Sequence, residues 1–137
     1  MTTAFLTHPD CLSHVNPTGH PEQVARLEYI LDRMNRSEFD ALQRHDAPLG
    51  SDENILSTHP IAHLNAIKAA VPAQGWTSID ADTSVSPGSL KAAYRGVGAN
   101  VKAVDLVMSG AATNAFCATR PPGHHAETQT AMGFCYF

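Results

Sequence analysis

Short apolar runs alternate with longer amphipathic segments along this chain. Residues 3–7, 76–79 and 115–118 are short and rich in apolar side chains, so each predicts a brief strand. Between these runs, apolar residues recur every three or four positions, which is the spacing of a helix with one buried face. The order of strand, helices, strand, long helix and strand predicts an α/β fold with a parallel sheet and helices on its faces.

The first three expected helices begin or end at residues that favour helix termini. Pro21 is expected to open the first helix, with Glu22 in its first turn, where the helix dipole favours an acid. Ser51 is expected to cap a short second helix. Pro60 is expected to open a third helix, which Pro72 ends. The expected apolar stripes of the first and third helices are Val24, Leu27, Leu31 and Met34, and Ile61, Leu64, Lys68 and Val71.

The longest expected helix begins at Pro87, which follows the capping residue Ser86, and stops at Gly110. Gly96 and Gly98 each weaken a helix by roughly 1 kcal/mol relative to alanine, so we expect a neighbouring element to pack closely against them. The expected buried stripe of this helix consists of Leu90, Tyr94, Val97, Val101, Val104 and Met108.

Length and charge narrow the classes of function. A chain of 137 residues is long enough for one domain with a modest core. The net charge is −4 and the nine Lys and Arg residues are scattered, which argues against direct binding to nucleic acid or to an anionic membrane. No apolar stretch has the length of a membrane span. Three cysteines without CxxC spacing are typical of a reduced, cytoplasmic protein.

The segment after the last predicted strand has the strongest chemical signal. It is Arg-Pro-Pro-Gly-His-His-Ala-Glu at residues 120–127, in which two prolines and a glycine predict a rigid loop. Loops at the carboxyl ends of parallel strands commonly bind ligands. Because histidine exchanges protons near neutral pH, His124 and His125 predict an acid/base pair. The alternative is two surface histidines with no chemical role.

Other groups of histidines and carboxylates have spacings that are weaker evidence for a metal site. Residues 8–20 form a loop whose histidines and cysteine match no common zinc module, so we interpret them as loop polarity, with a structural metal site as the alternative. His59 and His63 lie one turn apart without an HExxH glutamate, which favours ordinary surface histidines. Asp80 and Asp82 lack the other ligands of a calcium loop.

The sequence RPPGHHAE, followed by Gly-Phe-Cys-Tyr-Phe at residues 133–137, resembles the histone deacetylase and acetylpolyamine amidohydrolase family, in its class II-like branch. The resemblance covers essentially the whole chain. It implies that residues 1–137 are the N-terminal part of a single deacetylase-like catalytic domain, with a partial three-layer α/β/α, arginase/deacetylase-like fold that ends after the His-His loop. Upstream segments that match in the expected order are HPDCL at 8–12, GHPE at 19–22, Arg26-Leu27, Asp82-Thr83 and Ser86-Pro87.

The resemblance implies a zinc-dependent deacetylase that hydrolyses acetyl-lysine or an acetylated small amine. His125 is then the main proton shuttle and His124 its electrostatic partner. The zinc ligands, an Asp-x-His pair and a second Asp, are expected beyond residue 137, together with the transition-state tyrosine and the carboxylates that orient the histidines. No metal ligand is therefore predicted within this segment.

The resemblance also assigns residues to the substrate. Asp82 is expected to accept hydrogen bonds from the substrate backbone, for which a carboxylate is chemically suited; the alternative is a turn residue before the next helix. Gly133 is expected to position the substrate at close range, and Phe134 to line a narrow tunnel for an alkyl amine chain. Arg26 is expected to point toward an internal channel; as a residue off the apolar stripe of its helix, it could equally be solvated.

The apolar, strand-like run at 133–137 is an unusual end for a domain, so we expect a truncation and an inactive isolated chain. The alternative function is a non-catalytic fragment or binding module whose exposed apolar C-terminal strand pairs with another chain, giving a homo-oligomer or a complemented enzyme. A redox role for Cys117 and Cys135 is a weaker alternative, because thiols in apolar runs are usually inert.

Overall fold

The computed structural model describes residues 1–137 and contains a three-stranded parallel sheet. The central strand is β1 (Thr3–Thr7), with β2 (Gln43–Asp46) on one side and β5 (Asn114–Cys117) on the other. Leu6 of β1 lies opposite both His45 and Cys117. The parallel sheet and its strands near residues 3–7 and 115–118 are confirmed. The strand β2 was not predicted, because its sequence is polar.

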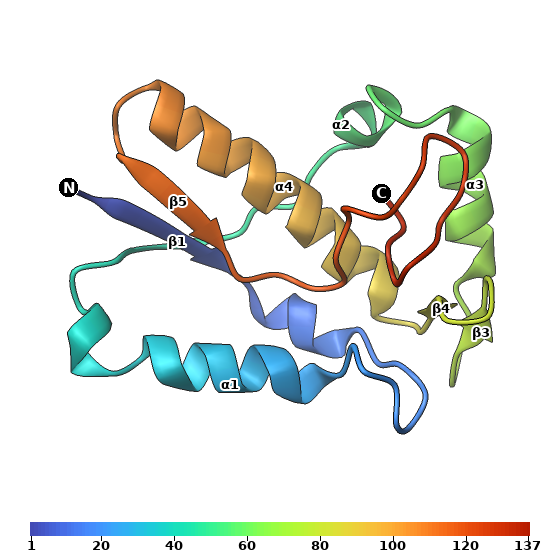
Figure 1. Ribbon diagram of the computed structural model, residues 1–137. Helices are drawn as coiled ribbons and strands as arrows, with labels where there is room; N and C mark the ends of the chain where they lie inside the picture. Colours follow the sequence, from blue (N-terminus) through green and yellow to red (C-terminus); the bar gives the residue numbers. More distant parts are fainter.

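Helices cover both faces of this sheet, which confirms the three-layer α/β/α arrangement. Figure 1 shows α1 (Val24–Met34) on one face and α4 (Ser89–Met108) on the other. Side chains of β1 alternate between the two layers, as those of a strand must. Phe5 packs on the α1 side with Leu27, whereas Leu6 packs on the α4 side.

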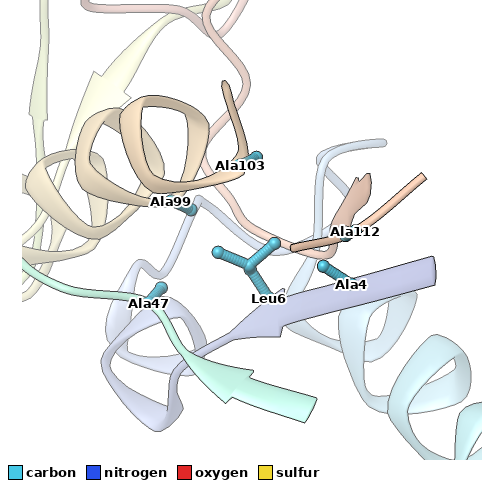
Figure 2. Packing of buried hydrophobic residues seen from close by; sticks show 6 residues of the cluster. All are labelled: Ala4, Leu6, Ala47, Ala99, Ala103 and Ala112. Carbon is cyan, nitrogen blue, oxygen red and sulfur yellow. The ribbon is translucent and has the colours of Figure 1, made fainter. Parts of the chain in front are cut away.

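The helix α4 contacts the sheet through small residues. Figure 2 shows Leu6 projecting from β1 toward Ala99 and Ala103. Val104 and Met108, from the expected stripe, are 60% and 80% exposed, so that prediction was wrong. Small side chains let the helix approach the sheet closely. The face of α4 that is buried is therefore the one with small residues, and not the one with large apolar residues. The buried residues of α4 are Ser89, Ala92, Ala93, Gly98, Ala99 and Ala103.

Two helices begin later than expected. The helix α1 begins at Val24, with Gln23 as its N-cap, so Pro21 and Glu22 belong to the preceding loop. The helix α4 begins at Ser89, after Gly88. The helices α2 (Asp52–Leu56) and α3 (Ile61–Ala70) begin as expected, and Ser51 and Asn54 form a capping box at α2. The remaining helical turns are η1 (Pro9–Ser13) and η2 (Ser37–Phe39).

Two predicted strands are not part of the main sheet. The segment at 76–79 contributes β3 (Thr77–Ser78), which pairs antiparallel with β4 (Ser84–Val85) in a separate hairpin. Residues 133–137 form a turn and not a strand. Positive φ angles at Gly133 and Phe134 fold this segment back, and the side chains of Cys135 and Tyr136 are fully buried. The expectation of an exposed apolar C-terminal strand was therefore wrong.

A third hydrophobic cluster lies beyond the sheet and joins α3, the hairpin and α4 to the C-terminal turn. Tyr136 is its largest side chain, and its hydroxyl donates a hydrogen bond to the carbonyl of Ser84. The buried members are Ile67, Val85, Ala93, Ala131 and Tyr136. None of the helices combines the length and apolar character that crossing a membrane requires.

The close approach at Gly98 gives a prediction for stability. A Cβ atom at Gly98 would lie 2.2 Å from the Pro48 carbonyl oxygen and 2.6 Å from the Gly50 nitrogen, both backbone atoms. We expect Gly98→Ala to lower the free energy of unfolding by about 1–3 kcal/mol, measured by urea denaturation.

Gly96 on the same helix is the matched control. A Cβ atom there would meet nothing closer than 3.7 Å, so Gly96→Ala should raise stability by up to about 1 kcal/mol. Equal stability of the two variants would contradict the close-packing interpretation.

Candidate active site

The His-His loop leaves the carboxyl end of β5 and presents both imidazoles at the surface. Arg120, at its start, is buried, and the peptide bond from Arg120 to Pro121 is cis. His124 and His125 are exposed, with ring centroids 4.3 Å apart and planes inclined at 51°. The two histidines are therefore adjacent in space and available to a ligand at this end of the sheet.

Gly133 lies directly against the ring of His125. A Cβ atom on Gly133 would meet the His125 Cβ, Cγ and Cδ2 atoms at 2.8, 2.9 and 3.0 Å, and the φ angle of Gly133 is +57°. Both observations require glycine at this position. The His125 N–H also donates to the Cys135 sulfur at 3.4 Å. The C-terminal turn therefore packs against His125 and restricts its position, and residues 125 and 133 belong to one site.

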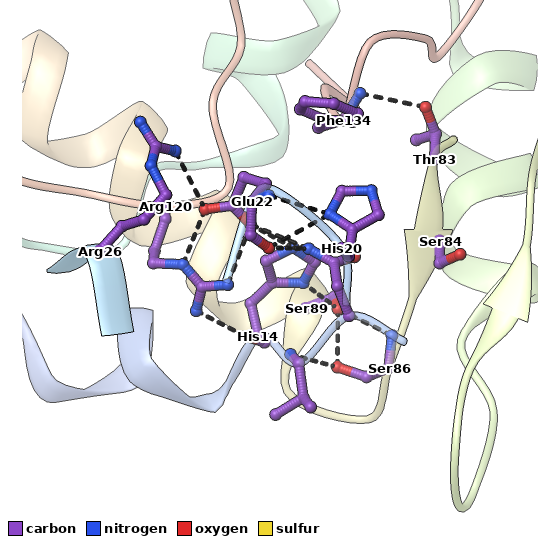
Figure 3. Close-up of polar contacts among 12 residues, drawn as sticks. His14, His20, Glu22, Arg26, Thr83, Ser84, Ser86, Ser89, Arg120 and Phe134 are labelled. Atoms are coloured by element: carbon purple, nitrogen blue, oxygen red, sulfur yellow. Dashed lines mark hydrogen bonds and ion pairs between the residues drawn. The ribbon is translucent and has the colours of Figure 1, made fainter. Parts of the chain in front are cut away.

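His20 links Phe134 to the segment of Asp82 and Thr83. The Phe134 N–H donates to the Thr83 hydroxyl at 3.1 Å, and its ring lies edge-on to that of His20 at 4.6 Å (Figure 3). His20 Nε2 donates to the Asp82 carbonyl at 2.9 Å, because its Nδ1 accepts the Glu22 N–H. The Asp82 side chain is exposed and accepts the Thr83 hydroxyl. Sequence reasoning did not assign His20 to this group.

A buried ion pair anchors the first residue of the His-His loop. Arg120 and Glu22 form two parallel hydrogen bonds, from Nε to Oε1 at 2.8 Å and from Nη2 to Oε2 at 2.9 Å. Arg120 Nη1 donates to the carbonyls of Cys11 and His14. The two residues are 3% and 1% exposed, and Figure 3 shows the pair at the centre of a polar network. The expected helix-dipole role of Glu22 was wrong.

His14 and serines at the start of α4 extend this network. His14 Nδ1 lies 2.6 Å from the Ser89 hydroxyl, and its Nε2 lies 3.3 Å from Glu22 Oε2. Burial lowers the pKa of His14, although Glu22 opposes this effect. Burial alone would raise the pKa of Glu22, but hydrogen bonds from His14 and Arg120 outweigh it and lower that pKa to about 2. Glu22 therefore stays ionised in the interior.

Two cavities border the loop. One of about 650 Å³ is lined by His124 and by residues of α2, α4 and the C-terminal end. The other, of about 150 Å³, lies beside Arg120 and is lined by Arg26 and Cys117 among others. Arg26 is largely exposed, and its Nη1 lies 3.7 Å from Glu22 Oε1. This position is compatible with a channel residue, and that role stays a prediction.

His59 and His63 hold the C-terminal loop to α3. Their rings stack at 4.7 Å, and both residues are buried, so their interpretation as surface histidines was wrong. His63 Nε2 donates to the Tyr136 carbonyl at 2.7 Å, and His59 Nδ1 donates to the Thr128 carbonyl at 3.0 Å. His63 lies in the first turn of α3, whereas His59 precedes the helix, and the partners of both histidines come from a distant segment that the sequence spacing does not indicate.

The donors of this chain do not fit a metal site. No three His, Cys, Asp or Glu side chains are grouped to hold a metal ion, and this includes the histidines and the cysteine of the 8–20 loop.

The three thiols are unpaired, and burial raises the pKa of each one. A thiolate is the reactive form, so the redox alternative finds no support here.

The ionisation of Glu22 predicts a pH-dependent stability. A pKa near 2 in the folded state, against 4.5 for the unfolded chain, corresponds to a stabilisation on the order of 3 kcal/mol. This stabilisation is fully present above pH 4.5 and is lost as the pH falls toward 2. In urea denaturation, the wild-type chain should lose stability more steeply below about pH 4.5 than Glu22→Gln does.

Glu28→Gln is the control for this measurement, because Glu28 is exposed on α1. It should follow the wild-type pH dependence. The same acid dependence in the wild type and in Glu22→Gln would contradict the role assigned to Glu22.

The chain is similar to known proteins in sequence and in fold. The model of the histone deacetylase domain matches residues 20–137. The histone deacetylase-like amidohydrolase of Pseudomonas aeruginosa is 40% identical over 122 residues, which are 87% of this chain and 31% of that protein. A probable deacetylase of Archaeoglobus fulgidus is 30% identical over 139 residues, covering 99% of this chain and 38% of the relative.

The crystal structure of the HDA15 HD domain has the same fold. It superposes with a TM-score of 0.91 at 25% identity, over 98% of this chain and 40% of that one. This chain thus spans between three and four tenths of the length of these proteins. Because the family model matches most of the chain, which also shares its fold with a solved HD domain, the chain belongs to the histone deacetylase family.

Proposed function

We propose that residues 1–137 are the N-terminal part of a single catalytic domain, and that the whole protein is a zinc-dependent deacetylase. One observation carries this proposal: His124 and His125 are adjacent and exposed on a loop at the carboxyl end of a parallel sheet, with Gly133 packed against His125. Membership of the family supports amide hydrolysis as the reaction class. The zinc ligands would lie outside this segment, whose own side chains do not group around a metal.

The two histidines fit the proton transfers that amide hydrolysis needs. A base takes a proton from the attacking water, and an acid returns one to the leaving amine. We assign both transfers mainly to His125, which the backbone of Gly133 and the sulfur of Cys135 hold in place. His124, with its ring 4.3 Å away, would tune the charge of His125 and would not exchange the proton itself.

The substrate side of the proposal rests on Asp82, Gly133 and Phe134. The carboxylate of Asp82 is exposed at the rim and would accept N–H groups of the substrate backbone. Phe134 would line a tunnel for the alkyl chain, and Gly133 would let that chain pass close to His125. This arrangement suits acetyl-lysine in a peptide or an acetylated small amine. Arg26 would border a channel that leads away from the site.

A cytoplasmic location and the lack of direct nucleic-acid contact remain proposals drawn from charge and cysteine content. The binding-module alternative loses its basis, because the C-terminal segment on which it depended is buried. Association between copies stays a prediction. The exposed apolar side chains that could serve it lie instead on α4 and β5, and include Val104, Met108 and Phe116.

The catalytic assignment is tested in the full-length, zinc-loaded protein. We expect His125→Ala to lower kcat for an acetyl-lysine peptide roughly 10²- to 10⁴-fold, because general acid–base catalysis is lost, and His124→Ala to have a smaller effect. The purified 137-residue chain should show no turnover. An acetylated polyamine assayed in parallel distinguishes the two substrate classes.

His45→Ala is the matched control, because His45 lies on β2, on the opposite side of β1 from β5. It should keep wild-type kcat. Unchanged turnover in His125→Ala, or no turnover in the zinc-loaded full-length protein, would refute the proposed function.

A further inference from the structure

The loop that carries the two histidines is held at its far end by the C-terminal turn, where Gly133 packs against His125 and the Cys135 sulfur accepts the His125 N–H. Beyond β5, its backbone leaves the sheet after the Ala118 N–H bonds the Leu6 carbonyl at 2.8 Å. His124 and His125 are themselves exposed. At its near end, Arg120 is the one buried charged residue between the sheet and the histidines, which makes it the candidate anchor there.

Arg120 is fixed by four hydrogen bonds to a single neighbouring segment. Two go to the Glu22 carboxylate, and the other two go to the carbonyls of Cys11 and His14. A guanidinium held in this bidentate way has a defined orientation as well as a defined place. Only three residues, two of them prolines, separate Arg120 from His124, so the position of Arg120 restricts where the histidines can lie.

Glu22 reaches the opposite side of the site through its backbone. Its N–H donates to Nδ1 of His20, whose Nε2 donates to the Asp82 carbonyl. The ring of His20 also contacts that of Phe134. The same residue therefore holds the start of the catalytic loop with its side chain and the proposed substrate rim with its backbone.

We propose that the Glu22–Arg120 ion pair is a positioning pair, which sets the placement of His125 relative to the substrate rim formed by Asp82 and Phe134. This inference rests on the proposed deacetylase function and adds to it two residues that do not touch substrate. Because catalysis is sensitive to misplacement of reacting groups on the scale of 1 Å, a loosened pair should slow the reaction while the fold persists.

The test uses Arg120→Lys in the full-length, zinc-loaded protein, because lysine keeps the charge and loses the fork that Glu22 binds. Glu22→Gln, which keeps the length and loses the charge, is the second variant. We expect each to lower kcat at least about tenfold at a temperature where circular dichroism shows the protein folded. Hydrogen exchange at residues 120–126 should become faster in both variants.

Asp10→Asn is the matched control. Asp10 binds Arg95 at 2.8 Å, and this ion pair ties η1 to α4 without touching the His-His loop. It should lower stability while it leaves kcat within about twofold and leaves the exchange of residues 120–126 unchanged. A similar loss of kcat in Asp10→Asn and Arg120→Lys would mean that general destabilisation explains the effect, and would overturn the positioning role.

A double-mutant cycle with His125→Ala separates positioning from stability. If Arg120 acts through His125, Arg120→Lys should cost little further activity once His125 is absent. Full additivity of the two changes, or wild-type kcat in Arg120→Lys and Glu22→Gln, would overturn the positioning pair and leave the proposed function intact. No turnover in the wild type, or no effect of His125→Ala, would instead overturn the proposed function and this inference with it.

Discussion

A buried pair of opposite charges connects the loops around the candidate active site. Glu22 and Arg120 are almost fully buried and lie 98 residues apart in the sequence. Removing water from both charges is costly, and the bidentate geometry with further hydrogen bonds on each partner is what offsets that cost. Losing one partner of such a pair typically destabilises a protein by about 3–5 kcal/mol, because the other charge is left without compensation. The loops on both sides of the site depend on this contact.

The sheet and α4 supply the rigid base on which that contact is built. The helix approaches the sheet through alanine and glycine, and at Gly98 the backbone of residues 48–50 leaves no room for a side chain. Such close contact fixes the beginning of α4, where Ser89 meets His14. The packing of small residues between α4 and the sheet thus positions the start of α4, where the polar network around His14 forms.

The elements that could be predicted are those whose own residues determine them. The apolar runs of β1 and β5, and the caps of α2 and α3, identified these elements correctly. The strand β2 is Gln-Arg-His-Asp, and only its pairing with β1 makes it extended. The buried face of α4 was missed because large apolar residues of that helix, such as Val104, turn toward the surface.

The candidate site likewise contains features that the local sequence predicts and features that depend on distant segments. The adjacency of His124 and His125 follows from the sequence, and the prolines and glycine before them indicate a loop. The burial of Arg120, Glu22 and His63 does not follow, since each is polar and takes its partner from a distant segment.

The order in which the strands are joined has a consequence for biosynthesis. The central strand is made first, yet one of its neighbours is β5, and Thr7 bonds Ala118 across 111 residues of sequence. While the intervening helices emerge from the ribosome, the edge of β1 that pairs with β5 therefore stays unpaired, and the carboxylate of Glu22 has no Arg120 to bind. Contacts of such long range form slowly. Until β5 is translated, the nascent chain therefore exposes an unpaired strand edge, and such an edge favours aggregation.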